Sequence, residues 1–392
     1  MGSIVPLRGK RDFSRLISAL TVAVALCVAS DVTGQQEDVA ATRLKALALE
    51  QQGLNPEAEQ IWNGIAKADP QNAEALAHLG LLEARQEHLE IAIDFYRRAL
   101  AINPDLPGLR MNLGLAFFKA AQFPDAIKSF SSEIRKHPGD ARLTILLGMA
   151  HYGMKDYLVA IPYLRRAIER DAQSVTLRMT LAHSCLWSKQ YQCVLKMHEE
   201  IMALNAESAE TDMLAGQAFD QTGDSAGAMK EFRAAVSKDP KEPNAHFGLG
   251  YLLWTEGKWS EATSEFQLEL ENDPRHIQAR IYLADSWVRL NELAKALSEL
   301  EKLGDRERSE SLVSRDLGII YANNNRNEDA LRELESAIAF DPEDKEAHMQ
   351  LAKLYQSMNR RNDSNAELAK TRQLPSRNLP SLEEMIASVD TP

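Results

Sequence analysis

Cysteine, aromatic residues and positive charge are all scarce in this sequence. Three cysteines among 392 residues are too few for a disulfide-rich scaffold. Lysine and arginine number 45 against 57 aspartates and glutamates, which gives a formal charge of −12. Such a chain lacks the positive surface with which nucleic-acid binders release counterions. Hydrophobic residues still make up 44% of the chain, too many for a disordered one, so we expect a folded, acidic protein that binds no nucleic acid.

Residues 1–34 have the three-part layout of a secretory signal peptide. A basic start is followed by an apolar run over residues 16–29 and by the small residues Ser30 and Gly34. The run is shorter than the roughly 18–20 residues that span a bilayer, and no later segment reaches that length. We expect cleavage after Ser30 or Gly34 and an exported, periplasmic or secreted protein with no membrane span. The alternative is an uncleaved N-terminal membrane anchor.

A period of 34 residues runs through the rest of the chain. Small residues recur at this interval without an insertion or deletion, at Gly80, Gly114, Gly148, Ala182, Gly216, Gly250, Ala284, Gly318 and Ala352. Twelve positions after each stands a second residue that is nearly always alanine, and four further on a bulky one. Within each unit, apolar residues recur at spacings of three and four, which predicts two amphipathic helices joined by a short polar turn. Small residues on both helices predict a close approach of the two backbones.

Proline marks the end of most units, because it cannot continue a helix. Pro107 and Pro243 instead stand at the start of a unit. We expect each to occupy the first position of a helix, where its missing N–H costs nothing.

This order of Leu–Gly, Ala, an aromatic residue, Ala and Pro resembles the tetratricopeptide repeat. The resemblance implies an all-α fold, an α-solenoid of about ten antiparallel helix pairs in a right-handed superhelix with a concave groove. It covers ten units, at residues 39–72, 73–106, 107–140, 141–174, 175–208, 209–242, 243–276, 277–310, 311–344 and 345–378. The unit 175–208 departs from the pattern at Val194, His198 and Ala206, and the unit 277–310 has Arg308 in place of proline.

Residues 379–392 remain after the last unit. Leu382, Met385, Ile386 and Val389 form one apolar stripe at helical spacing. We expect a C-terminal capping segment whose short helix, residues 381–389, covers the last repeat. A frayed tail is the alternative.

Motifs of catalysis are missing or lie in the wrong context. Residues 223–227 fit the nucleophile pattern G-x-S-x-G, but that motif needs a preceding strand, and here it falls in a turn between two helices. The sequence contains no H-E-x-x-H and no Walker A motif. We expect no catalytic residue, no cofactor and no enzyme activity.

Cysteine and histidine gather in the unit 175–208, at His183, Cys185, Cys193 and His198. Their spacing matches no structural zinc pattern, so no metal site is expected. An exported compartment makes a disulfide between Cys185 and Cys193 a candidate, and two free thiols are the alternative.

The resemblance implies that the fifth, ninth and twelfth residues of the first helix of each unit line the groove. Most of these residues are apolar in the third to eighth units, and methionine and aromatic side chains suit a surface that adapts to a partner. The expected peptide groove consists of Met111, Leu115, Phe118, Ile145, Met149, Tyr152, Met179, Met213, Phe247, Tyr251, Trp254 and Ile281. On this hypothesis Phe247→Ala or Trp254→Asp weakens partner capture and hardly changes thermal stability. The alternative is that neighbouring helices bury the stripe.

The sequence therefore favours an exported, non-enzymatic scaffold that mediates protein–protein interaction. Its partner is a protein or peptide with an apolar or extended segment, and its setting is the assembly of an envelope or secretion complex. Two alternatives stay open. One is a metal-binding or redox-sensing protein that uses the cysteine and histidine cluster, and the other is a purely structural spacer.

Overall fold

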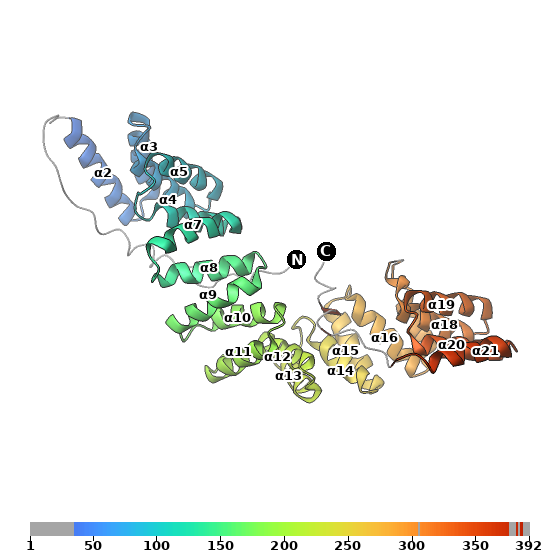
Figure 1. The fold of residues 1–392 in the computed structure, drawn as a ribbon. Coiled ribbons are helices and arrows are strands. Elements are labelled where there is room, and N and C mark those ends of the chain that lie inside the picture. Colours follow the sequence, from blue (N-terminus) through green and yellow to red (C-terminus); the bar gives the residue numbers. More distant parts are fainter. Residues whose placement is uncertain (1–34, 305, 376–381, 383–384, 387–392) are drawn as a thin grey trace. The chain divides into compact units, whose positions relative to one another are not determined.

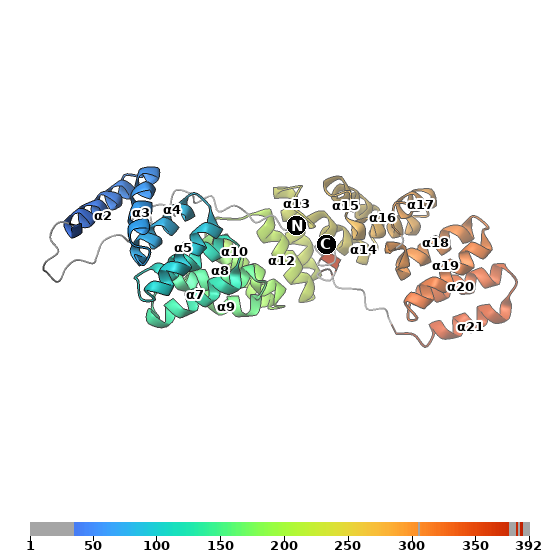
Figure 2. The same ribbon diagram turned by 90° about the horizontal axis from the view of Figure 1, so that it is seen from above.

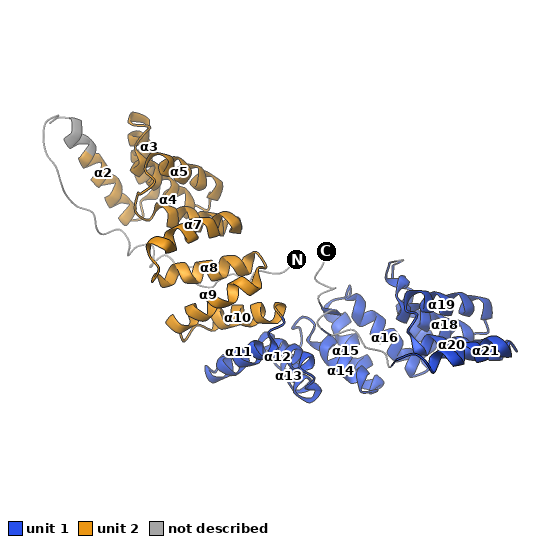
Figure 3. Ribbon diagram, in the orientation of Figure 1, with its two compact units in different colours: residues 1–2, 189–392 blue, residues 3–188 orange. Residues whose placement is uncertain are grey.

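The computed structural model describes residues 35–304, 306–375, 382, 385 and 386. The predicted signal peptide lies outside these residues. The described chain contains twenty α-helices, one short 3-10 helix and no strand, which confirms the all-α solenoid of helix pairs (Figure 1). The described residues form two compact units, residues 35–188 and the described residues from 189 onward (Figure 3). No helix of the described chain is long and apolar enough to cross a membrane.

The first unit holds nine helices among its described residues. They are α2 (Gln35–Gln51), α3 (Asn55–Ala68), α4 (Ala73–Arg85), α5 (Leu89–Ile102), α6 (Leu109–Lys119), α7 (Phe123–Lys136), α8 (Ala141–Gly153), α9 (Tyr157–Arg170) and α10 (Val175–Trp187). Each even-numbered helix up to α8 packs on the helix that follows it, and each pair packs on the next pair (Figure 2).

The second unit continues the same alternation. Its helices are α11 (Tyr191–Ala203), α12 (Ala209–Gln221), α13 (Ser225–Lys238), α14 (Ala245–Thr255), α15 (Trp259–Asn272), α16 (Ile277–Arg289), α17 (Leu293–Leu300), η1 (Glu307–Ser309), α18 (Ser311–Asn323), α19 (Asn327–Phe340), α20 (Lys345–Ser357) and α21 (Arg361–Thr371). We call the first helix of each pair an A helix and the second a B helix.

Small residues set the distance between the two helices of a pair. A Cβ atom added at Gly114 would lie 2.5 Å from the ring of Phe130, and one added at Gly250 would lie 2.8 Å from the ring of Phe266. Both rings are fully buried. The glycine in the A helix is therefore the space in which the aromatic ring of the B helix sits, which is the close approach that the sequence predicts.

The turn between the A and B helices requires a left-handed residue in every pair. These residues have φ between 56° and 81° and follow one another at 34-residue intervals: Gly53, Glu87, Ala121, Lys155, Lys189, Gly223, Gly257, Asn291, Asn325 and Asn359. Only glycine adopts this conformation without strain, and asparagine tolerates it better than most residues. In four turns the left-handed residue is neither glycine nor asparagine, and its strained backbone lowers the stability of the fold.

The prediction for Pro107 and Pro243 is wrong. Helices α6 and α14 begin two residues later, at Leu109 and Ala245. The N–H of Leu109 donates to the carbonyl of Leu106 at 3.3 Å, so Pro107 lies inside a turn whose next residue, Gly108, has φ 75°. Proline followed by a left-handed residue is the pattern of a type II turn, and this turn delays the helix.

The unit 277–310 departs from the repeat where its proline is missing. Helix α17 is only eight residues long and is followed by η1. The guanidinium of Arg308 donates to the carbonyls of Leu303 and Glu301, both at 3.1 Å. Arg308 thus satisfies carbonyl groups just beyond the end of the helix, where a cation is favourable.

Candidate functional site

The candidate site is the A-helix face, by which we mean the side chains at the fifth, ninth and twelfth positions of the repeat units, which lie on the A helices. In the first unit, seven of the predicted groove residues are half-buried: Met111, Leu115, Phe118, Ile145, Met149, Tyr152 and Met179. Their neighbours on the packing side of the same helices, such as Leu143 and Leu147, are fully buried. The face is thus a distinct apolar surface that solvent still reaches.

Ring contacts connect this face from one helix pair to the next. The rings of Tyr152 on α8 and His183 on α10 lie 6.5 Å apart. The ring of Tyr152 also lies 5.7 Å from that of Tyr157 at the start of α9. Tyr157 in turn stacks on Trp187 at 6.2 Å. The apolar surface therefore continues between repeats.

The A-helix face of the second unit is largely closed. Phe247 and Ile281 have no exposed area, and Tyr251 retains 4%, whereas Met213 and Trp254 are half-buried. The ring of Phe247 lies 5.9 Å from that of Phe266 and 6.3 Å from that of Tyr282. The expectation that Phe247→Ala hardly changes thermal stability is wrong, because the ring is part of a core. Phe247→Ala therefore creates a cavity and lowers stability.

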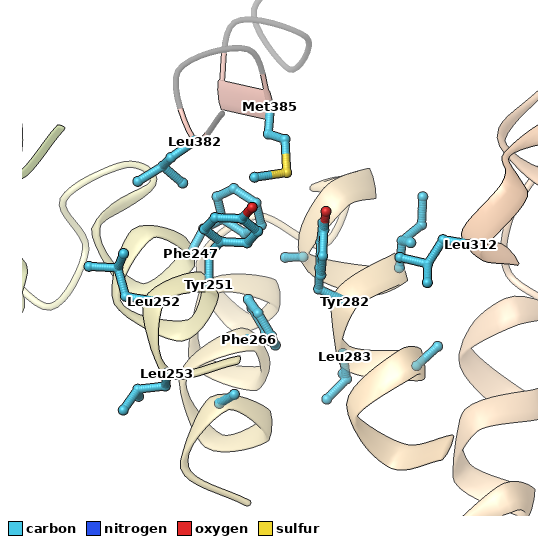
Figure 4. Close-up of a cluster of buried hydrophobic side chains, with 14 of the residues drawn as sticks. Phe247, Tyr251, Leu252, Leu253, Phe266, Tyr282, Leu283, Leu312, Leu382 and Met385 are labelled. Carbon is cyan, nitrogen blue, oxygen red and sulfur yellow. The ribbon is translucent and has the colours of Figure 1, made fainter. Parts of the chain in front are cut away.

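The C-terminal segment contributes to this closure. Leu382, Met385 and Ile386 are 0%, 4% and 6% exposed and belong to the hydrophobic cluster that contains Phe247 and Tyr251. Figure 4 shows Leu382 and Met385 beside the two rings. The expectation that the segment caps the last repeat is therefore wrong for these described residues; Val389 and most of residues 379–392 lie outside the described residues.

The composition of α21 explains why the last repeat does not attract this segment. The residues that α21 buries are Ser364, Glu367 and Thr371, and its sequence RNDSNAELAKT is largely polar. A polar outer helix needs no cap, because a terminal repeat of this kind is already compatible with water. The aromatic surface between α14 and α16 gains more from burial.

A buried charge network extends the face beyond the residues that sequence reasoning selected. The indole N–H of Trp254 donates to Asp285 at 2.6 Å, and Arg315 donates to the other oxygen of Asp285 at 2.5 Å. Arg315 also lies 3.4 Å from Asp316 and 3.5 Å from Asp344. Burial lowers the pKa of Arg315, but these carboxylates raise it by more, so its pKa lies above its ordinary value and the guanidinium stays charged.

Arg315 occupies the fifth position of its A helix, the register that holds Met111 and Phe247 in other repeats. Following the same register into the ninth repeat would have found it. Burial and the carboxylate of Asp285 both raise the pKa of Asp316 well above its ordinary value. This end of the second unit is thus polar and charged, in contrast to the apolar face at α14.

The cysteine and histidine cluster of the fifth repeat does not present free thiols. Cys185 and Cys193 are both disulfide-bonded, so neither supplies a thiolate ligand. His198 instead lies 3.4 Å from Asp212 and 3.7 Å from Glu231.

Among the described residues, His198, Asp212 and Glu231 form the group whose ligand atoms lie within 4.8 Å of one another. Lysine amines already pair with both carboxylates, since Lys238 lies 2.6 Å from Asp212 and Lys230 lies 2.7 Å from Glu231. Their charge is therefore balanced by the protein itself.

Comparisons with known proteins agree with the helical pairs. A family model of the tetratricopeptide repeat matches residues 43–107, 111–175, 213–277 and 315–375. Protein CTR9 homolog of Arabidopsis thaliana is 21% identical over 254 residues, which cover 62% of this chain and 23% of that protein. Superkiller protein 3 of Schizosaccharomyces pombe is 21% identical over 261 residues, 61% of this chain and 18% of that protein. The chain thus spans less than a quarter of the length of these two relatives.

Solved structures also match this chain, at low sequence identity. A tetratricopeptide repeat protein from Parabacteroides merdae is 18% identical, with a TM-score of 0.44, and the match covers 63% of this chain and 97% of that one. The family model covers more than half of the chain, and its repeats fall on helix pairs whose small residues receive the bulky residues of the partner helix. The chain therefore belongs to the tetratricopeptide repeat family.

Proposed function

We propose that the chain is an exported, non-enzymatic scaffold that binds an apolar segment of a partner protein on its A-helix face. Proteins of this repeat family generally mediate protein–protein interactions. The observation that carries the proposal is the set of half-buried apolar side chains on the A helices of the first unit, of which Met111, Met149 and Met179 are methionines. Methionine side chains adapt their shape to an apolar partner. Assembly of an envelope or secretion complex is the setting that we propose.

Export is supported by the basic and apolar layout of residues 1–34 and by the disulfide-bonded state of Cys185 and Cys193. Disulfides persist mainly in oxidising compartments. Mass spectrometry of the unreduced protein from its host tests both points. A mature N-terminus after Ser30 or Gly34 and no free thiol at either cysteine support export, whereas an intact N-terminus and two free thiols contradict it.

Photo-cross-linking tests the binding surface. A photoreactive amino acid at Met149, on the A-helix face, is expected to give a discrete adduct with a partner protein in the native host. The matched control places the same group at Leu158 on the B helix α9, where the side chain is 66% exposed. Equal adducts from both positions, or none from Met149, would contradict the proposal and favour a structural spacer.

A further inference from the structure

The C-terminal segment lies on the part of the second unit that corresponds to the proposed binding surface of the first. Phe247 and Tyr251 stand at the fifth and ninth positions of their repeat unit, on the A helix α14, the same register as Met111 and Leu115 on α6. Solvent reaches the side chains on α6, whereas Phe247 and Tyr251 are buried in a cluster that includes Leu382, Met385 and Ile386. Equivalent positions therefore differ in whether they are covered.

The covering residues have the pattern of a bound amphipathic helix. Leu382, Met385 and Ile386 are helical and stand at positions i, i+3 and i+4, so their side chains lie on one face. All three are at least 94% buried. This is the anchor spacing with which helical peptides bind apolar grooves.

The segment follows the last repeat and is far along the sequence from the helices that it covers. Leu382 stands 100 positions after Tyr282, the last buried aromatic residue of the cluster. The helices under the segment pack as helices do elsewhere in the unit, with the B helix α15 between the A helices α14 and α16. Such a tethered segment competes with any free ligand of the same surface through its effective concentration.

We propose that Leu382, Met385 and Ile386 are an internal ligand of the α14–α16 surface and that a partner's helix must displace them to bind there. This inference rests on the proposed function, since it assigns the partner of the A-helix face in the second unit. That partner presents apolar side chains at i, i+3 and i+4 of a short helix, as this segment does. The chain is thus self-inhibited at this surface, while the A-helix face of the first unit stays available.

A binding experiment with the chain's own segment tests the inference without knowledge of the partner. The probe is a fluorescein-labelled peptide of residues 379–392, titrated with the full chain and followed by fluorescence anisotropy. We expect the full-length variant Met385→Asp/Ile386→Asp to bind the peptide at least tenfold more tightly than the wild type. The apparent dissociation constant rises with the fraction of molecules whose surface is already occupied.

Two controls make the result specific. Leu368→Asp, at a residue that is 39% exposed on α21, changes an apolar side chain near the same end of the chain and is expected to bind the peptide as the wild type does. A peptide that carries the substitutions of Met385 and Ile386 is expected to bind neither protein. A milder variant, Met385→Ala, is expected to give an intermediate affinity and decides the test if the double variant does not fold.

Three results would overturn the inference. They are equal affinity of the wild type and the segment variants, no binding of the peptide to a folded variant, and loss of cooperative unfolding in both segment variants. The last result would make the segment an integral part of the core. None of these results bears on cross-linking at Met149, which lies in the other unit, so failure of this inference is distinguishable from failure of the proposed function.

Discussion

Arg315 is buried among three carboxylates, so its removal leaves uncompensated negative charge inside the second unit. Its side chain is 3% exposed, and those of Asp285, Asp316 and Asp344 are at most 1% exposed. We expect Arg315→Met to lower the free energy of unfolding by about 3–5 kcal/mol, as in other broken buried ion pairs. Urea unfolding measures this loss.

The control for Arg315 is Arg332→Met, which breaks an ion pair with Asp329 at a side chain that is 74% exposed. Exposed pairs contribute at most about 1 kcal/mol. Similar losses for the two variants would show that the buried network contributes no more than a surface pair.

The burial of His276 leads us to expect that the folded protein loses stability in acid. Its ring is buried, with Nδ1 accepting the N–H of Ala279 at the start of α16 and Nε2–H donating to Asn244. Burial lowers its pKa from 6.5 to about 4, although Asp273 partly opposes the shift. Below pH 6.5 the unfolded chain therefore takes up a proton that the folded chain does not, and acidification favours unfolding until pH 4.

Between pH 7 and pH 5 this linkage lowers the free energy of unfolding by about 2 kcal/mol. In His276→Asn, asparagine keeps a side chain suited to an N-cap and does not titrate. Urea unfolding at the two pH values is expected to show a fall that is smaller by this amount in the variant. An unchanged pH dependence would contradict the assignment.

At the scale of the helix pair, the turn between the A and B helices limits stability because only some turns carry the residue that their backbone requires. Ala121 has φ 57° and Gly257 has φ 74°. A left-handed backbone costs a non-glycine residue about 1 kcal/mol. A Cβ at Gly257 meets no atom closer than 3.8 Å, so substitution there tests the backbone alone.

We therefore expect Ala121→Gly to raise the free energy of unfolding by about 1 kcal/mol and Gly257→Ala to lower it by a similar amount. Denaturant unfolding of the two variants beside the wild type gives both values. Changes of the same sign would show that turn conformation does not control stability at these positions.

At the scale of the whole molecule, structural features that recur in every 34-residue unit could be predicted from the sequence. Features that occur only once could not. Small and bulky residues at fixed intervals determine both the helix pairs and the packing of Gly250 on Phe266. The start of α6 was missed because a type II turn at Pro107 replaces the first helical turn. The position of Leu382 was missed because it depends on a contact with residues far away in the chain, for which periodicity carries no signal.

The candidate site divides in the same way. Register alone selected Met149 and Tyr152, which lie half-buried on the A-helix face. Register also selected Phe247, which stands at an equivalent position in its unit. Phe247 is nevertheless buried, because burial depends on which segments cover a helix and not on the helix itself. Sequence reasoning thus locates the face, and only the structure distinguishes its open part from its covered part.

Capture of the partner by a variant of the A-helix face tests whether that face binds the partner. The variant Leu115→Gln/Met149→Gln removes two apolar side chains from the A-helix face with a residue that favours helices. Its matched control, Ile91→Gln/Leu158→Gln, changes two exposed residues of B helices, 50% and 66% exposed. We expect at least a tenfold fall in the partner captured by the face variant, with wild-type capture by the control and similar melting temperatures for both. Equal capture by the two folded variants would contradict it.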